Sequence, residues 1–131
     1  MMLFYLTLIL GAECQEIFEQ QNDDFVRSLD QSYLRGLLFL QNSQTEDGKW
    51  IDSSYGSEPG VLGMAVLAFL SRGDDPEFGP FSKPLARSIE QILRLQNKET
   101  GYIGNSMYNH GFATLALAEY YGLTNNTEIG P

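Results

Sequence analysis

The chain reads Leu40-Gln41-Asn42-Ser43-Gln44-Thr45-Glu46-Asp47-Gly48-Lys49-Trp50 at the point where an apolar run with helical spacing gives way to a polar turn, a glycine and an aromatic residue. An altered copy reads Leu95-Gln96-Asn97-Lys98-Glu99-Thr100-Gly101-Tyr102. Each copy leads through a glycine-containing link into a segment rich in small apolar residues. A unit of about 50 residues that is used twice predicts a helical repeat.

Two of the predicted helices are amphipathic. The first covers about residues 25–42, and its apolar face follows i, i+3, i+4, i+7 spacing through Leu34, Leu37, Leu38 and Gln41. The second begins at Ser82, a residue suited to the N-cap, and its predicted buried face holds Leu85, Ile89, Ile92, Leu93 and Gln96. Its predicted outer face holds Arg87, Glu90, Gln91 and Arg94.

The other two predicted helices, about 61–71 and 112–121, are apolar almost all round. Each is too short to cross a bilayer, so we expect inner helices that are surrounded by others. Gly63, Ala65 and Ala68 should let neighbouring helices approach closely. Gly73 and Gly122 are the expected C-terminal caps of the two helices. The order amphipathic then apolar, twice, predicts an all-α protein with two helical hairpins at about 29–73 and 82–122.

The remaining segments lie outside the expected repeat region, 29–124. Residues 1–14 contain a short uncharged apolar run that is followed by Ala12 and Cys14, the pattern of a cleaved signal peptide. The alternative is a buried N-terminal helix or strand. Residues 15–28 form a polar lead-in and 125–131 a polar tail. With the signal peptide, the protein would be secreted or periplasmic and not transmembrane.

Composition limits the partners and the chemistry. The net charge of −9 disfavours binding to nucleic acid, because an acidic surface repels phosphates. One cysteine and one histidine exclude an internal disulfide and the usual four-ligand Cys/His zinc site. Asp74-Asp75 could suggest an acid catalyst or a metal ligand, but the turn chemistry of Asp and Pro76 is the favoured interpretation. We therefore expect no metal and no cofactor.

The repeated stretches resemble the QW-type repeats of the squalene cyclase and prenyltransferase-like superfamily. The segment 107–119 is similar to a recurrent segment of bacterial prenyltransferase and squalene-oxidase repeat proteins. This resemblance implies an α/α toroid, of which this chain would supply two hairpins of a larger barrel as an N-terminal fragment. It also implies a terpene cyclase-like enzyme (an isomerase or mutase) acting on isoprenoid-type substrates, inactive as this fragment. The alternative is a non-catalytic secreted scaffold with the same fold.

Few residues stand out as functional candidates within this repeat. His110 precedes the second apolar helix and is either a general base or a hydrogen-bonded residue that fixes the loop. Trp50 either docks on the core or stacks on a ligand. Candidate ligand contacts are Tyr102, Tyr108 and Phe112. The residues that we expect to fasten one hairpin to the next are Gln41, Gly48, Trp50, Gln96, Gly101 and Tyr102.

Two hairpins of a larger barrel would leave apolar inner faces uncovered. An uncovered face of this kind favours self-association, because burying apolar area against a second molecule is favourable. In a full-length form the partner would be an isoprenoid or a protein ligand.

Overall fold

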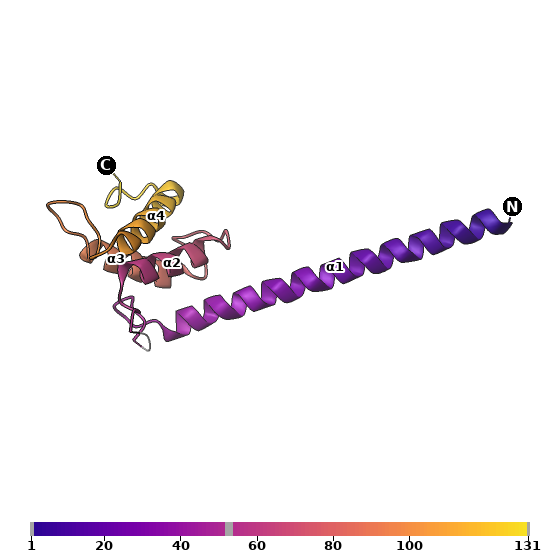
Figure 1. Cartoon of the computed structure of the whole chain (residues 1–131), viewed down its shortest axis with the longest axis horizontal. Helices are drawn as coiled ribbons and strands as arrows, with labels where there is room; N and C mark the ends of the chain where they lie inside the picture. The colour runs from indigo at the N-terminus through magenta and orange to yellow at the C-terminus, as the bar shows by residue number, and fades with distance from the viewer. Residues whose placement is uncertain (1, 52–53, 131) are drawn as a thin grey trace. The chain divides into compact units, whose positions relative to one another are not determined.

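The computed structural model describes the backbone of residues 2–51 and 54–130, and the side chains of residues 22–51 and 54–130. It contains four helices in this part of the chain: α1 (Met2–Ser43), α2 (Pro59–Leu70), α3 (Ser82–Arg94) and α4 (Met107–Thr124) (Figure 1). The prediction of an all-α protein is confirmed. The chain separates into two compact units, Met1–Gly36 and Leu37–Pro131, which are described in turn.

The first unit consists of helix α1 up to Gly36. This helix begins at Met2 rather than near residue 25, so it runs through the expected lead-in 15–28. The reason is local: residues 12–35 contain neither glycine nor proline and are rich in Glu and Gln, which are good helix formers. Phe25, Val26 and Leu29 are all more than half exposed. The side chains of the expected signal peptide, residues 1–14, lie outside the described residues.

A search of the described residues finds no helix that is both long and apolar enough to cross a membrane. Helix α2, the most apolar of the four, has only 12 residues. A bilayer core needs about 20 such residues in a helix.

The second unit is built around α2, which packs against both α3 and α4 (Figure 1). Its contact with α4 is unusually close at Gly63, where a Cβ atom would lie 2.6 Å from the carbonyl oxygen of Phe112. Near the start of both helices, the backbone N–H of Gly60 donates to Asn109 Oδ1 at 3.1 Å. Two such contacts, in the same order along both helices, show that α2 and α4 run parallel. The prediction that Gly63 permits close approach is confirmed.

The core of this unit is built from α2, α3 and α4, which contributes the buried Ala113 and Ala116, together with Leu37 from the last turns of α1. Its fully buried side chains include Leu37, Leu62, Val66, Phe69 and Ile92. Phe81, just before α3, packs against Phe69 with ring centroids 5.2 Å apart and the ring planes tilted by 33°. The core therefore joins both predicted hairpins into one unit.

Three details of the predicted helix faces are wrong. Leu38 of α1 is 41% exposed, and Leu37 is the fully buried member of the expected apolar face. Gln91 of α3, assigned to the outer face, is buried, because this side of α3 faces the loop that precedes α2. Ser82 is the first helical residue of α3 rather than its N-cap, a position that Phe81 holds without a side-chain hydrogen bond.

The two copies of the repeated stretch form the same kind of turn. In the first, Thr45 N–H donates to the Lys49 carbonyl at 2.8 Å, and Gly48 has φ +81°. In the second, Asn97 N–H donates to the Tyr102 carbonyl at 2.8 Å, and Gly101 has φ +73°. Both turns need a glycine because other residues rarely adopt a positive φ.

Hydrogen bonds set the register between the two turns. Gln44 Nε2 donates to the Gly48 carbonyl, and Gln96 Nε2 donates to the Gly101 carbonyl. Gln44 rather than Gln41 is therefore the counterpart of Gln96. Counted from the glycines Gly48 and Gly101, which lie one residue further apart than the two glutamines, Trp50 corresponds to Ile103, and both are buried. Matching the letters Leu-Gln-Asn places the two copies three residues out of register at this glutamine.

A third pair of equivalent segments follows α2 and α4. Gly79 N–H donates to the Asp75 carbonyl at 2.7 Å, and Gly130 N–H donates to the Asn126 carbonyl at 3.3 Å. The side chains of Asp75 and Asn126 both accept backbone N–H groups two residues further on. The repeat therefore extends beyond the hairpins into the segments 74–79 and 125–130.

The predicted C-terminal caps have different outcomes. Gly73 follows α2 with φ +82°, as predicted. Gly122 lies inside α4, because this helix continues to Thr124 and is capped by Asn125 at φ +53°. Asparagine is one of the few other residues that tolerate this conformation.

Candidate functional site

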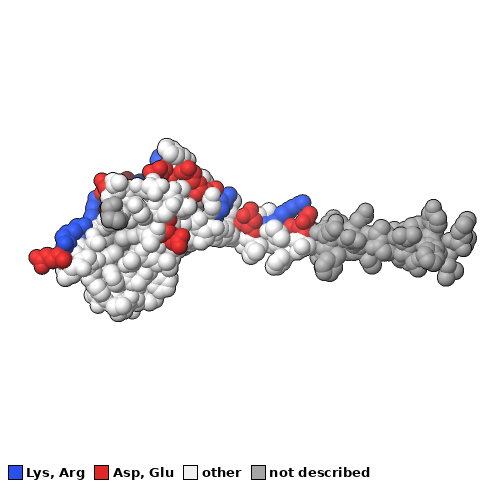
Figure 2. Space-filling model, turned by 90° about the horizontal axis from the view of Figure 1, so that it is seen from above, with Lys and Arg blue, Asp and Glu red and all other residues white. Residues whose placement is uncertain are grey.

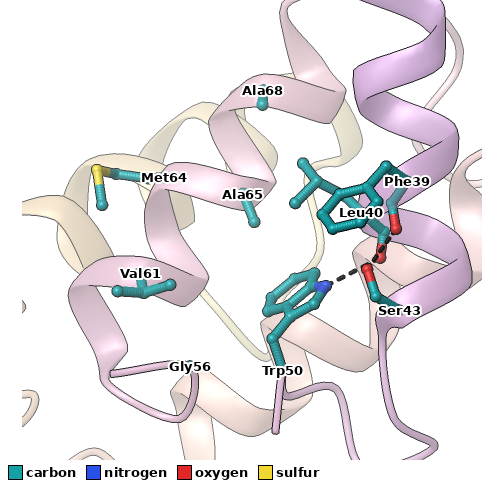
Figure 3. A pocket seen from close by; sticks show the side chains of 9 residues that line it. All are labelled: Phe39, Leu40, Ser43, Trp50, Gly56, Val61, Met64, Ala65 and Ala68. Atoms are coloured by element: carbon teal, nitrogen blue, oxygen red, sulfur yellow. Dashed lines mark hydrogen bonds between the residues drawn. The ribbon is translucent and has the colours of Figure 1, made fainter. Parts of the chain in front are cut away.

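An apolar pocket of about 450 Å³ opens between the end of α1, the loop that follows it and α2. All of its described residues belong to the second unit: Phe39, Leu40 and Ser43 from α1, Trp50 and Gly56 from the loop, and Val61, Met64, Ala65 and Ala68 from α2 (Figure 3). One side of α2 packs against α4. The α2 residues Val61, Met64, Ala65 and Ala68 face the end of α1 across the pocket.

Trp50 forms one wall of this pocket and is held at two points. Its indole Nε1–H donates to the Leu40 carbonyl at 2.9 Å, and its backbone N–H donates to the Gly56 carbonyl at 3.0 Å. A Cβ atom at Gly56 would lie 1.6 Å from the Trp50 carbonyl oxygen, so only glycine fits there. With 9% of its surface exposed, the ring is docked on the unit and also presents a fixed apolar face to the pocket (Figure 3).

The described lining offers apolar contacts and little else. Ser43 is its only hydroxyl, and this group already donates to the Phe39 carbonyl. Ala65 and Ala68 keep the α2 side of the pocket open because their side chains are short. Phe39 and Met64 are partly exposed at the rim. The arrangement suits an apolar group with no charge to be matched.

The predicted candidates Tyr102 and His110 come together, but away from this pocket. Their rings stack with centroids 4.4 Å apart and an interplanar angle of 19°. His110 Nδ1 accepts the backbone N–H of Ile103 at 3.2 Å. His110 Nδ1 is therefore an acceptor that holds the loop before α4, which is the contact that the loop-fixing interpretation of His110 requires.

Tyr108 and Phe112 form a separate aromatic pair on α4. Their ring centroids lie 4.8 Å apart at 59°, and Tyr108 Oη donates to Met64 Sδ at 3.4 Å. Tyr108 reaches α2 at Met64, on the rim of the apolar pocket, but neither ring lines that pocket, so the four predicted aromatic and imidazole candidates do not converge on one site. Of the candidate ligand contacts named in the sequence, Trp50 lines the apolar pocket, and Tyr102, Tyr108 and Phe112 do not.

The most connected polar residue is Asn109, which is buried. Its Oδ1 accepts the Gly60 N–H, and its Nδ2 donates to Glu58 Oε2 at 2.6 Å and to Asn105 Oδ1 at 3.0 Å. Its own backbone N–H donates to the N-cap Ser106. Asn109 therefore ties together the beginnings of α2 and α4. In the sequence, Asn109 stands three residues after Ser106, and this spacing is compatible with an N-cap at Ser106. The spacing does not indicate that Asn109 also binds the beginning of α2.

The paired aspartates have structural partners. Asp74 Oδ2 lies 2.8 Å from Arg72 Nε, and Asp75 Oδ1 accepts the backbone N–H groups of Glu77 and Phe78 at 2.9 Å each. These contacts hold the turn after α2. Among the described side chains, no group of three or more His, Cys, Asp or Glu is arranged to hold a metal ion.

Sequence reasoning missed most of the pocket. Phe39 and Leu40 lie in the first predicted amphipathic helix but outside the four positions given for its apolar face, and Val61, Met64 and Ala68 lie in a predicted inner helix. The sequence did contain one signal for the pocket, because α2 is apolar on every side. Two neighbours, α3 and α4, do not cover all sides of such a helix, so one apolar face is left for a pocket.

No family model, no curated protein and no solved structure matches this chain. Membership of the squalene cyclase and prenyltransferase-like superfamily stays a prediction from the repeated stretches and the segment 107–119.

Proposed function

We propose that this chain is a non-catalytic binding scaffold of the α/α-toroid type, two hairpins of a squalene cyclase and prenyltransferase-like repeat. Three features support the toroid: the parallel contact of α2 with α4, the equivalent turns at Gly48 and Gly101, and the equivalent segments 74–79 and 125–130. A parallel arrangement of successive inner helices is what stacked hairpins require.

The ligand that we propose is an uncharged isoprenoid-type chain in the apolar pocket. The observation that carries this proposal is the pocket itself, about 450 Å³ with an apolar described lining and a fixed indole wall. Pockets of about 300–1,000 Å³ are typical of small-molecule sites. A branched hydrocarbon chain offers many contacts with such a lining and needs no polar partner there.

Intrinsic fluorescence tests this proposal directly, because Trp50 is the only tryptophan in the chain. We expect titration with farnesol, a fifteen-carbon isoprenoid alcohol, to change the Trp50 emission in a saturable way. Ala68→Leu should weaken binding by about tenfold or more, since it adds bulk to the α2 side of the pocket.

Ala86→Leu is the matched control, because Ala86 is exposed on α3 and lies away from the pocket. This variant should bind farnesol as the unmodified chain does. A lack of saturable response, or equal binding by Ala68→Leu, would overturn the proposal. Formation of a cyclised product from squalene would favour the terpene cyclase alternative instead.

A further inference from the structure

A second pocket, the polar pocket, has a volume of about 480 Å³ and opens where α2 and α4 begin. It is distinct from the apolar pocket, with which it shares one described lining residue, Val61. Its other described lining residues come from the loops before α2 and α4 and from the first turn of α4: Tyr55, Glu58, Asn105, Ser106, Tyr108 and Asn109. Aromatic rings, a carboxylate, amides and a hydroxyl group therefore line one cavity.

Tyr108 is held in place on one side of the polar pocket. A Cβ atom at Gly60 would lie 2.8 Å from Tyr108 Cε1 and 2.9 Å from Cδ1, so the glycine leaves the space that the ring needs. The phenol hydroxyl donates to Met64 Sδ, and the ring is still 53% exposed. Tyr55 is more exposed, and its carbonyl accepts the Glu58 backbone N–H at 2.9 Å. The pocket thus has two accessible aromatic side chains, and the one on α4 is fixed.

Asn109 orients the polar groups of the pocket and leaves part of each group open. Its Nδ2 donates to Glu58 Oε2 and Asn105 Oδ1, and its backbone N–H donates to Ser106 Oγ. Among the described residues, no group forms a hydrogen bond with Glu58 Oε1, with the amide hydrogens of Asn105 or with the hydroxyl hydrogen of Ser106. An acceptor and two kinds of donor are therefore available to a ligand.

The charges around the polar pocket favour an uncharged ligand. Because α2 and α4 run parallel, both place their N-terminal ends at this pocket, and these ends carry partial positive charge that opposes a cation. The carboxylate of Glu58 opposes an anion, and so does the acidic surface: in Figure 2, acidic side chains gather along one edge of the helical body. No Lys, Arg or His belongs to the described lining. A neutral ligand with several hydroxyl groups meets neither opposition.

We propose that the polar pocket binds a pyranose saccharide. One face of a sugar ring presents C–H groups that can lie against Tyr55 or Tyr108, as an apolar body does on an aromatic ring. Its hydroxyl groups both donate and accept, so they match Glu58 Oε1 as well as the donors of Asn105 and Ser106. An aromatic surface with a few oriented polar groups in one cavity is the pattern of a small-molecule site. The proposal goes beyond the isoprenoid ligand and does not depend on it.

Saturation-transfer NMR on the full chain tests this proposal, because it detects weak binding and identifies the ligand hydrogens that touch the protein. The probes are cellobiose and, separately, N,N′-diacetylchitobiose. We expect saturable transfer to at least one of them, strongest at the axial hydrogens of one ring face. Tyr55→Ala removes an aromatic contact, and Glu58→Gln keeps an oxygen for Asn109 while it replaces the open acceptor by a donor. Each variant should weaken binding by about tenfold or more.

Phe78→Ala and Glu119→Gln are the matched controls, because both side chains are exposed and lie outside the lining of the polar pocket. Both variants should bind the disaccharide as the unmodified chain does. Absence of transfer to both probes would overturn the proposal, and so would undiminished binding by Tyr55→Ala and Glu58→Gln. Ala68→Leu acts on the apolar pocket and should leave disaccharide binding unchanged, so the saccharide and the isoprenoid proposals can fail separately.

Discussion

Gly63 and Gly111 occupy equivalent positions on α2 and α4, but only Gly63 is covered by a neighbouring helix. We expect Gly63→Ala to lower the free energy of unfolding by about 1 kcal/mol or more, because the new methyl group meets the rigid backbone of Phe112. Gly111→Ala should raise it by about 0.5–1 kcal/mol, since alanine is the better helix former and meets nothing. Urea denaturation of dilute monomer measures both.

This comparison has an internal control in Gly122, which is also open and helical. Gly122→Ala should stabilise the chain about as much as Gly111→Ala does. Equal effects of alanine at positions 63 and 111 would contradict the close parallel packing of α2 on α4.

Tyr120 gives the fold a dependence on alkaline pH. Burial raises the pKa of its phenol above the usual value of 10.0, and the carboxylate of Glu77 adds to this shift. The fold favours the neutral phenol, so the associated stability is fully present below about pH 10 and is lost as the pH rises from there through the folded-state pKa. We expect the urea midpoint of the unmodified chain to fall more steeply between pH 9 and 11 than that of Tyr120→Phe.

Tyr55→Phe serves as the control for this measurement, because Tyr55 is 69% exposed. It should keep the alkaline decline of the unmodified chain. Lysine deprotonation contributes to all three curves and cancels when they are compared. Identical curves for Tyr120→Phe and the unmodified chain would show that the phenol is ionised as readily in the folded state as in the unfolded one.

At the scale of the elements, hydrophobic periodicity predicted the existence and order of the helices but not their ends. Helices α2 and α3 were placed to within about two residues. The start of α1 was missed because polar residues such as Glu and Gln are compatible with a helix and contribute no apolar stripe. Gln91 was misplaced because a polar residue can be buried where a loop from another element covers it.

A match of residue types between the two copies of the repeat does not establish their structural register. The match Leu-Gln-Asn was real as a sequence similarity, yet its first copy lies inside α1 and its second copy follows α3, and hydrogen bonds align Gln44 with Gln96. The repeated segments 74–79 and 125–130 were missed because only one glutamate and one glycine coincide, Glu77 with Glu128 and Gly79 with Gly130. The two segments form the same backbone turn although most of their side chains differ.

The pocket could be predicted only in part, through Trp50. An indole in a polar loop predicts docking, and the ring does dock. Whether a cavity remains beside it depends on how α1 and α2 are spaced, which is set by Gly56 and by the hydrogen bond to Leu40. Sequence patterns carry no information on this spacing, because the same alanines would pack tightly in a narrower hairpin.

On the scale of the whole molecule, the two units differ in what stabilises them. In Leu37–Pro131, buried side chains from three helices and the preceding turns hold the backbone in place. Residues 22–32 of α1, by contrast, have exposed side chains at every position. Short local interactions such as the Ser32 hydroxyl bond to the Ser28 carbonyl are all that the described side chains add there. Most helical stability in proteins comes from tertiary packing rather than from propensity.

Hydrogen exchange should therefore divide the chain sharply. In dilute monomer we expect the amides of residues 22–32 to exchange within seconds to minutes, as in a helix that opens locally, and those of Leu62, Val66 and Ile92 to exchange only through global unfolding. Protection of residues 22–32 equal to that of the core in dilute monomer would contradict the division, because a helix with solvent on all sides has no packing to resist local opening.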